Sequence, residues 1–560
     1  MPATSSSPHH LWRTSRLCIL HFAFCILQFL VFSPLASTQE LEGRVVEHTL
    51  PNGMKFLFLR RPGAPVFAGN IRFRAGGVDE QTGETGIAHM FEHMAFKGTQ
   101  RIGTTDYAKE KVLLDRIDSV AVAFSRKRSD IPEDDLDSLR DLEKSLADSL
   151  KAARKEDPAA LALNDLKARS ARPGGDPALK RYIEMRGLQD RLQALQQEHS
   201  KFVVKDEFWK TLETNGAVGL NAATGKDYTV YIEQLPSNRL ELWALLESER
   251  LRDPVLREFY AERDVVAEER RMSYDNAPEG KLYEALISTA FQAHPYGLPN
   301  IGWMSDIHNL TVADARRFYE TYYAPGNGVA ALVGDIDIEQ AKGIVTKYFG
   351  RLPARPLPPP RLTREPKQPG ERRVTVEFDA EPRVMIAFHR PTVPHFDDYV
   401  FDVIAYLLRD SGRSSRLYKS LIKEQKVAGE VSVYQSVPGS RYANVCMFEA
   451  TPIHPHTTAD VEAAIYAELD SLKTTPVSER EMQKVKNQVQ ASFVRGLASN
   501  AGLADKLTFA QVITGDWRYI SEHRKVIERI TPQDVMKAAQ KYFIPSNRTV
   551  ATLVKKGKEN

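Results

Sequence analysis

The chain has 560 residues, of which 42% are hydrophobic and 27% are charged, and its formal net charge is +3. This length allows roughly two to four domains, and the composition is that of a globular protein rather than a disordered or fibrous one. A net charge this small gives no support for a nucleic-acid-binding protein, so we expect no nucleic-acid partner.

Residues 1–37 are typical of a secretory signal peptide. Arg13 and Arg16 precede an apolar run over residues 17–32, and the small residues at 34–37 follow near a cleavage site. A retained membrane anchor is the alternative, although the run is short for a membrane span. We expect an exported protein, in the bacterial periplasm or secreted, with no membrane span once the signal is removed.

The cysteines support a protein that folds without disulfides. Loss of the leader would remove Cys18 and Cys25 and leave Cys446 alone. An exported chain with one cysteine has no internal disulfide, so its stability must come from the core. Cys446 lies in an apolar run and is expected to be a buried small side chain.

Strand-like patterns at residues 56–59 and 66–68 lead through glycines into the segment His-Met-Phe-Glu-His. If this segment is helical, His89 and His93 stand at i and i+4, one turn apart on one face. Two imidazoles so placed can bind one metal ion. Glu92 lies beside them, where it can take a proton from a water molecule that the metal activates.

The order H-x-x-E-H is the inverse of H-E-x-x-H and is the inverzincin motif. An isolated pair of histidines at this spacing is more often a surface or packing feature than a metal site. Here the strands upstream and the glycines before His89 indicate a strand, a tight turn and a helix, which is a plausible setting for an active site.

Residues 105–210 differ in character from the rest because they are dense in charge. Leu142, Leu146 and Leu150 recur every four residues, as on an amphipathic helix, and a second helical pattern follows the turn at 173–175. We expect a long helical hairpin inserted into the first domain. A solvated arm and a docking or gating arm are both compatible with it, and we favour the first.

A catalytic zinc needs a third protein ligand and an open position for water. Residues 240–251 form an amphipathic pattern, and three glutamates follow that could supply this ligand. Glu262 and Glu269 are two helical turns apart and share a face. Glu269 is our choice, Glu262 is the nearest rival and Glu268 is the third.

A proline-rich stretch at residues 354–370 predicts a semi-rigid linker. Beyond it, residues 371–557 repeat the theme of residues 44–353 weakly. Residues 545–554 parallel residues 325–333, because in each case a tyrosine-containing helix end is followed by Pro, Asn and a closing strand. Two related domains and the insertion then account for the length.

Several motifs, in order, resemble the zinc peptidases of the pitrilysin, insulin-degrading enzyme and mitochondrial processing peptidase family. They are His89 to His93 with 96–99, 219–231, 262–269, 294–297 and 412–418. The resemblance covers about residues 44–104 and 210–555. The gap between His93 and Glu269 is longer than in the family by about the length of the charged insertion.

The resemblance implies an α+β fold of two similar α/β domains, each a mixed sheet flanked by helices. They would close in a clamshell arrangement, with a long helical insertion in the first. It also implies one Zn²⁺ per chain, with Glu269 as the third ligand and Glu262 orienting the ligands. A peptide substrate would add as a strand to the edge of a sheet. Asn221 and Ala222 resemble the family segment that forms this edge. A simple strand and turn is the alternative for these two residues.

One departure from the family concerns the second domain. The family commonly carries there an Arg and a Tyr, seven residues apart, that contact substrate. Ile422 and Gly429 occupy these places here. Our hypothesis is that a related chain supplies the pair in a heterodimer, with a homodimer as another arrangement. Alternatively, Arg416 or Tyr418 compensates, or the substrate is unusual.

The sequence therefore predicts a zinc metalloendopeptidase that hydrolyses peptides or unfolded protein segments, with Glu92 as general base. One rival is a catalytically idle subunit of the same fold with a structural or binding role. The intact motif and Glu269 argue against it. A non-haem iron oxygenase also uses two histidines and one carboxylate. The placement of Glu92 and the lack of a recognisable cosubstrate motif argue against that second rival.

Overall fold

The computed structural model describes residues 41–408 and 415–557. The expected signal peptide at 1–37 and residues 412–414 of the 412–418 motif lie outside the described residues. Residues Val46–Asn560 form one compact unit, distinct from Met1–Val45.

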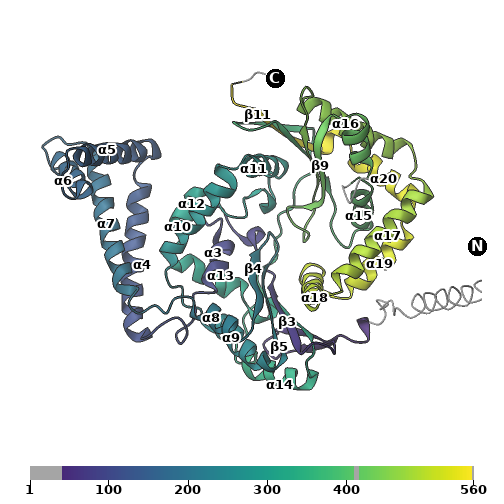
Figure 1. Ribbon diagram of the computed structural model, residues 1–560, viewed down its shortest axis with the longest axis horizontal. Coiled ribbons are helices and arrows are strands. Elements are labelled where there is room, and N and C mark those ends of the chain that lie inside the picture. Colours follow the sequence, from purple (N-terminus) through teal and green to yellow (C-terminus); the bar gives the residue numbers. More distant parts are fainter. Residues whose placement is uncertain (1–40, 409–414, 558–560) are drawn as a thin grey trace, which may run out of the picture. The chain divides into compact units, whose positions relative to one another are not determined.

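A six-stranded mixed sheet forms the centre of the first half (Figure 1), with the strand order β1-β2-β6-β3-β5-β4. β2 and β6 are parallel, and the other neighbours are antiparallel. The strands are β1 (Val46–Thr49), β2 (Lys55–Arg60), β3 (Val66–Phe73), β4 (Val218–Thr224), β5 (Thr229–Pro236) and β6 (Gly328–Gly334). The helices of this half outside the insertion are α3 (Ile87–Met94), α8 (Glu207–Thr214), α9 (Leu240–Arg252), α10 (Phe259–Arg270), α11 (Pro278–Ala290), α12 (Met304–Asn309), α13 (Val312–Tyr322) and α14 (Ile338–Phe349).

A five-stranded mixed sheet forms the centre of the second half, with the order β7-β11-β8-β10-β9. Its one parallel pair is β7 with β11. The strands are β7 (Arg372–Phe378), β8 (Arg383–Arg390), β9 (Ala428–Val437), β10 (Asn444–Pro452) and β11 (Arg548–Lys555). The helices are α15 (Phe396–Leu408), α16 (Thr458–Thr474), α17 (Glu479–Gly496), α18 (Asn500–Thr514), α19 (Tyr519–Arg529) and α20 (Pro532–Tyr542).

The same turn precedes one strand of the parallel pair in each sheet, β6 in the first and β11 in the second. A 3₁₀ turn precedes β6 at Pro325–Asn327, and another precedes β11 at Pro545–Asn547. The Asn327 side chain donates to the Tyr322 carbonyl at 2.8 Å, and the Asn547 side chain donates to the Tyr542 carbonyl at 2.8 Å. The resemblance between residues 325–333 and 545–554 therefore has a structural basis, since the same amide ties the helix end to the strand start.

The central strands of the first sheet are buried on both faces. Every residue of β6 is buried, and in β3 all residues after Val66 are buried. On one face, Phe67 packs edge-on against Trp243 of α9, with ring centroids 6.2 Å apart. Gly69 lies under the same indole, because a Cβ there would come within 2.6 Å of Trp243 Nε1. The other face of β3 carries polar residues and needs a different cover.

Helix α18, from the second half, supplies that cover. Thr508 of α18 donates to Asn70 Oδ1 at 2.8 Å and accepts from Arg72 Nε at 3.3 Å. Arg72 also forms an ion pair with Asp505 of the same helix. Asn70 and Arg72 are 2% and 1% exposed, so these contacts satisfy groups that would be costly to bury alone.

Helix α11 makes the reciprocal contact from the first half to the second sheet. Leu286 and Ile287 of α11 belong to one apolar cluster with Met385 of β8 and Leu553 of β11. The opposite face of this sheet has its own core, which includes the buried, unpaired Cys446. Each sheet is thus covered on one face by a helix of the other half.

The insertion contains four helices rather than a simple hairpin: α4 (Tyr107–Ser129), α5 (Glu133–Ala152), α6 (Pro158–Ser170) and α7 (Pro177–His199). α4 and α7 lie side by side, and α5 and α6 lie at their far end (Figure 1). Leu136 and Leu139 form the buried face of α5, while Leu142 is 37% exposed. The predicted leucine stripe is therefore confirmed only in part, because Leu146 packs against the same apolar cluster as Leu136 and Leu139 while Leu142 lies toward solvent.

These features confirm the expected fold class: two mixed sheets flanked by helices, with a helical insertion in the first half. Among residues 41–408 and 415–557, no helix is both long enough and apolar enough to cross a membrane.

Shortening Leu286 tests the contribution of α11 to the second sheet. Leu286 is fully buried in the shared cluster, so Leu286→Ala should lower the free energy of unfolding by about 2–5 kcal/mol. Leu362→Ala is the control, because Leu362 is 83% exposed and its truncation should change stability by about 0.5 kcal/mol or less. Denaturant unfolding of the full chain measures both, and equal effects would contradict the reciprocal packing.

Candidate metal centre

The helix that carries the H-x-x-E-H motif has a well-defined start. Gly86 adopts a φ of +90°, and a Cβ there would come within 2.4 Å of the Ile301 carbonyl oxygen, so glycine is required. The buried Glu80 carboxylate accepts hydrogen bonds from the backbone N–H groups of Gly86 and Ala88, each at 2.9 Å. A carboxylate at this end satisfies free N–H groups and complements the helix dipole.

His89 and His93 lie on one face of α3, as the spacing predicts. Their ring centroids are 4.7 Å apart, and the ring planes are at 79°. Met90, Phe91 and Met94 are buried on the opposite side, which fixes the rotation of the helix. The two imidazoles therefore face the same space while the rest of α3 packs into the core.

Glu269 of α10 meets these imidazoles. Its carboxylate oxygens lie 3.7 Å from His89 Nε2 and 3.8 Å from His93 Nε2. One ligand atom from each of the three residues falls within 4.8 Å of the others. Two ligands of a tetrahedral zinc are roughly 3.4 Å apart, so these three side chains are near enough to share one ion after small adjustments of their positions. Glu268, the third candidate, instead pairs with Arg271 at 2.8 Å.

Glu262 contacts His93 on the side of the imidazole ring that faces away from Glu269. Its Oε1 is 2.8 Å from His93 Nδ1, and its Oε2 is 2.7 Å from Lys97 Nζ. The Glu262 carboxylate thus binds His93 Nδ1, and His93 Nε2 is left available to coordinate a metal ion. Lys97 in turn balances the charge of Glu262 and reaches Glu258 at 3.4 Å.

The electrostatics separate the two histidines. Burial lowers the pKa of His89 to about 4, and the neighbouring His93 acts in the same direction. Burial alone would also lower the pKa of His93, but its hydrogen bond to Glu262 and the nearby carboxylates outweigh burial and raise it. The hydrogen bond from His93, with help from Lys97, lowers the pKa of Glu262 to about 2. His89 is therefore neutral near pH 7, as a metal ligand must be.

Glu92 points its carboxylate toward strand β4. Thr224, the last residue of β4, donates to it from both its hydroxyl and its backbone N–H. Burial raises the pKa of Glu92 and Glu269 adds to the rise, while Thr224 and His93 oppose it. A raised carboxyl pKa makes Glu92 a better proton acceptor than an ordinary exposed carboxylate.

The two residues expected to form a substrate-binding edge lie on β4 beside α3. Asn221 is exposed and Ala222 is partly exposed. In the described part of the chain, β4 pairs only with β5, which leaves its outer edge free. The Asn221 side chain accepts from the Ala222 N–H at 2.9 Å and a bulge follows Val218, so the edge is irregular.

The second half contains no arginine or tyrosine at positions 422 and 429. Ile422 packs against the core of that half, and Gly429 is exposed near the start of β9. Arg416, a possible substitute, is engaged with Glu481 at 3.0 Å. Tyr418 begins a short π-helix, Tyr418–Glu424, that precedes β9.

Sequence reasoning did not assign roles to Lys97 and Thr224. Lys97 is four residues, or about one helical turn, beyond His93. This spacing could have indicated that the two side chains lie on the same side of the chain. Thr224 gave no local signal, because it reaches Glu92 only after β4 is paired in the sheet.

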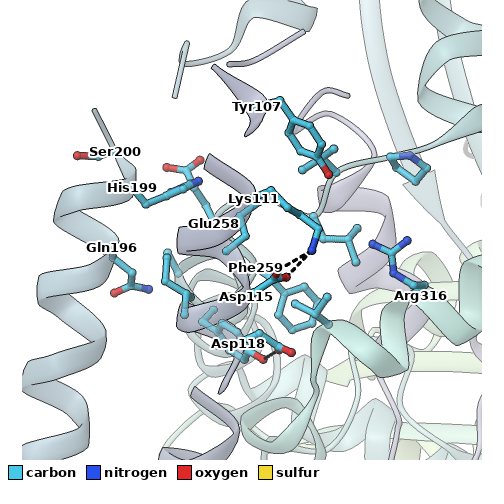
Figure 2. A pocket seen from close by; sticks show the side chains of 18 of the residues that line it. Tyr107, Lys111, Asp115, Asp118, Gln196, His199, Ser200, Glu258, Phe259 and Arg316 are labelled. Carbon is cyan, nitrogen blue, oxygen red and sulfur yellow. Dashed lines mark hydrogen bonds and ion pairs between the residues drawn. The ribbon is translucent and has the colours of Figure 1, made fainter. Parts of the chain in front are cut away.

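A cavity of about 220 Å³ lies at the root of the insertion, between α4, α7 and the start of α10 (Figure 2). Figure 2 shows Lys111 paired with Asp115 in its wall, at 2.6 Å, and His199 reaching in from α7. Glu258 also lines it and contacts Lys97. Through Glu258 and Lys97 this cavity adjoins the candidate metal centre, although His89, His93 and Glu269 do not line it.

Comparison with known families agrees with the fold. A family model described as "Peptidase M16 inactive domain" matches residues 309–489. That range begins after Glu269, so it includes none of the residues of the candidate metal centre. The matched segment runs from the end of α12 into α17 and so covers most of the second sheet.

Several sequence relatives carry the name of a protease or peptidase, and two of them illustrate the similarity. Zinc protease PqqE of Helicobacter pylori is 29% identical over 375 residues, which are 66% of this chain and 83% of the relative. Mitochondrial-processing peptidase subunit beta of Neurospora crassa is 23% identical over 343 residues, which are 59% of this chain and 71% of that subunit.

Many solved structures share the fold, and two of them illustrate the similarity. The crystal structure of a protease from Helicobacter pylori superposes with a TM-score of 0.69 and 23% identity, covering 91% of this chain and 99% of the other. The first half of the periplasmic protease PqqL from Escherichia coli superposes with a TM-score of 0.61 and 17% identity, covering 91% and 92%. In sequence and fold the chain is thus similar to M16 peptidases, the pitrilysin and mitochondrial processing peptidase group that its motifs resemble.

The pairing of His93 with Glu262 can be tested in the metal-free protein. Since Glu262 raises the pKa of His93, Glu262→Gln should lower it, as followed by NMR titration of the imidazole. The pair stabilises the metal-free fold most above pH 4.5, the ordinary carboxyl pKa, and below pH 6.5, the ordinary imidazole pKa. This stabilisation is lost as the pH falls toward about 2 and as it rises through the raised His93 pKa.

Glu268→Gln is the matched control for that titration, because Glu268 is on the same helix but pairs with Arg271. It should leave the pKa of His93 unchanged. An unchanged His93 pKa in Glu262→Gln, or an equal change in both variants, would contradict the proposed pairing.

Proposed function

We propose that this protein is a zinc-dependent metalloendopeptidase that hydrolyses peptides or unfolded protein segments. The observation that carries the proposal is the convergence of His89, His93 and Glu269, with donor atoms within 4.8 Å of one another, next to the carboxylate of Glu92. This set of two imidazoles and one carboxylate is one that catalytic zinc uses. The name zinc protease borne by relatives supports the same choice of metal.

A zinc ion held by these three residues would act as a Lewis acid on water and on the scissile carbonyl. Glu92 then takes the proton from the attacking water molecule and delivers it to the leaving amine. Thr224 keeps the Glu92 carboxylate directed toward β4. Glu262 fixes the orientation of the His93 ring through Nδ1.

The free edge of β4 is the proposed binding place for the peptide. An extended chain added there would use backbone hydrogen bonds, which bind without regard to sequence. Asn221 and Ala222 are proposed as contacts on that edge, and Thr224 at its end brings the added strand alongside Glu92. This arrangement favours extended or unfolded segments as substrates.

The domain division proposed for this activity is a metal-bearing domain at 44–353, with the insertion at 105–210, and a second domain at 371–557 after a linker at 354–370. Residues 1–37 are proposed to be a signal peptide that directs the protein to the periplasm. The periplasmic location stated for the structurally similar protease PqqL supports this compartment.

A partner chain is proposed to supply the missing Arg and Tyr. The presence of Ile422 and Gly429 at those places supports this, as does the description of one relative as a subunit. A related chain in a heterodimer is the first choice, and a homodimer is the second.

An idle structural or binding subunit is the second candidate function. The match to a family model described as inactive, over residues 309–489, favours it. The complete set of possible metal ligands, His89, His93 and Glu269, favours the peptidase, because an idle subunit has no need for such a set. Zinc content of the purified protein separates the two.

Substitution of Glu92 tests the proposed chemistry. Glu92→Gln should keep zinc, because Glu92 is not in the donor set, and should lower hydrolysis of a quenched mixed-sequence peptide by about 10²–10⁴-fold. His93→Ala should lose zinc as measured by metal analysis. Retained hydrolysis in Glu92→Gln would remove this residue from its role as base.

Restoring the absent pair tests the partner proposal. Gly429 is exposed, and a Cβ there would meet only the Ile453 side chain at 3.4 Å, so a tyrosine can be accommodated. Ile422→Arg with Gly429→Tyr should raise kcat/KM of the isolated mature chain at least about tenfold if the clamp is missing. Lys423→Arg with Glu430→Tyr is the neighbouring control. Full activity of the unmodified chain alone, unaltered by the first pair, would contradict the need for a partner.

A further inference from the structure

The turn between β9 and β10, residues 438–443, is the place where the second half contacts the surroundings of the metal-bearing helix. The Arg441 guanidinium binds both oxygens of the Asp79 carboxylate, at 2.8 and 3.3 Å. The two side chains are 5% and 4% exposed. A forked, buried contact of this kind is among the strongest and most directional that side chains make.

The backbone of the same turn is held by Asp227 and Tyr296 of the first half. Asp227 Oδ2 accepts from the N–H groups of Ser440 and Arg441, the second at 3.1 Å. The Tyr296 hydroxyl accepts from the Tyr442 N–H at 3.1 Å and donates to Asp227 at 2.6 Å. This gives a structural role to the motif at residues 294–297.

Close approach of the two halves depends on a glycine in this turn. A Cβ at Gly439 would come within 2.5 Å of Asp227 Oδ2 and 2.6 Å of the Tyr296 hydroxyl. Asp227 lies in the connection from β4 to β5, and Gly439 lies in the connection from β9 to β10. These connections occupy equivalent places in the two sheets, so the sheets meet through their matching turns.

Both residues held by this turn lead directly to helix α3. Asp79 adjoins Glu80, whose carboxylate accepts the first N–H groups of the helix from Gly86 and Ala88. Asp227 lies three residues beyond Thr224, which donates to Glu92. The turn therefore supports both the start of α3 and, through the segment after β4, the Glu92 carboxylate in the last turn of the helix.

The linker supplies a second cation, Arg361, near Asp79. It binds backbone carbonyl groups closely but lies farther from the Asp79 carboxylate. Arg361 donates to the carbonyl oxygens of Asp79 and Glu80, and its Nε is 4.0 Å from Asp79 Oδ1. Asp79 also accepts from the Gly76 N–H at 3.2 Å. Arg441 is thus the cation that fixes the direction of the Asp79 side chain.

We propose that Arg441 of the metal-free half is a positioning residue for the metal-bearing helix of the other half. It acts through Asp79 and Glu80 on the start of α3, and its turn acts through Asp227 on the segment that holds Glu92. The second half then contributes to the centre by setting its geometry, without giving a ligand. This inference rests on the proposed peptidase function for its effect on turnover, but not for its effect on the helix.

The test compares Arg441→Met with Arg383→Met in the full mature chain. Arg383 is a matched control, since it also lies in the second half and pairs across to the first, with Glu279 at 3.0 Å, far in sequence from α3. Hydrogen exchange by mass spectrometry reports on peptides covering 76–94 and 224–229, and chelator competition reports zinc affinity. Arg441→Met should speed exchange in those peptides and weaken zinc binding by about 10–100-fold.

The expected pattern is local. In Arg441→Met, hydrogen exchange in the strands of the second sheet should stay as in the parent protein. The kcat of this variant should fall with little change in KM. Arg383→Met should change neither the exchange nor the kinetic constants. If Arg441→Met does not fold, Arg441→Lys decides, because it keeps the charge but loses the fork and should give a smaller rise in exchange over 76–94. Unchanged exchange over 76–94, or the same change in Arg383→Met, overturns the proposal.

The exchange readout is independent of hydrolysis. A parent protein that shows no peptidase activity would refute the proposed function while the exchange comparison still tests Arg441. Conversely, an active parent whose helix exchange is unaffected by Arg441→Met would refute only the positioning role.

Discussion

Strands β3 and β6 are buried on both faces, so the first sheet needs an apolar or complementary helix on each side. Its own half covers one face with helices such as α9, and α18 of the second half covers the other. The second sheet is covered in return by α11. Neither sheet can therefore be satisfied without the other half, which explains why residues 46–560 form one unit although the chain repeats a motif.

The same exchange of contacts gives the candidate metal centre its setting. Helix α3 places His89 and His93, and α10 brings Glu269 and Glu262, so the centre is built by two helices packed within one half. The groups that hold α3 in place extend further, through Glu80 and Asp79 to Arg441. Control by the second half over the geometry of the candidate metal centre would explain why both halves are kept in the same chain.

Local pattern predicted the chemistry-bearing helix well because the period of 3.6 residues fixes which side chains share a face. The shared face of His89 and His93 was predicted in this way, whereas spacing left Glu262 and Glu268 open beside Glu269, and the structure brings Glu269 to the two imidazoles. The interior of the insertion was predicted less well, since two helices were expected and four are present. Apolar residues at helical spacing do not say which neighbour they will face, so Leu136 and Leu139, outside the predicted stripe, are buried while Leu142, within it, is largely accessible.

The sequence by itself determined the local elements: a helix with two histidines one turn apart, a helix with two glutamates on one face, and two halves that end in the same Pro-Asn turn and strand. These features depend on neighbours along the chain. Tertiary structure alone decided that Lys97 balances Glu262, that Thr224 holds Glu92 and that Arg441 reaches Asp79. Those contacts join residues from different elements, and Arg441 and Asp79 come from different halves, so no periodicity could reveal them before the sheets were paired and covered.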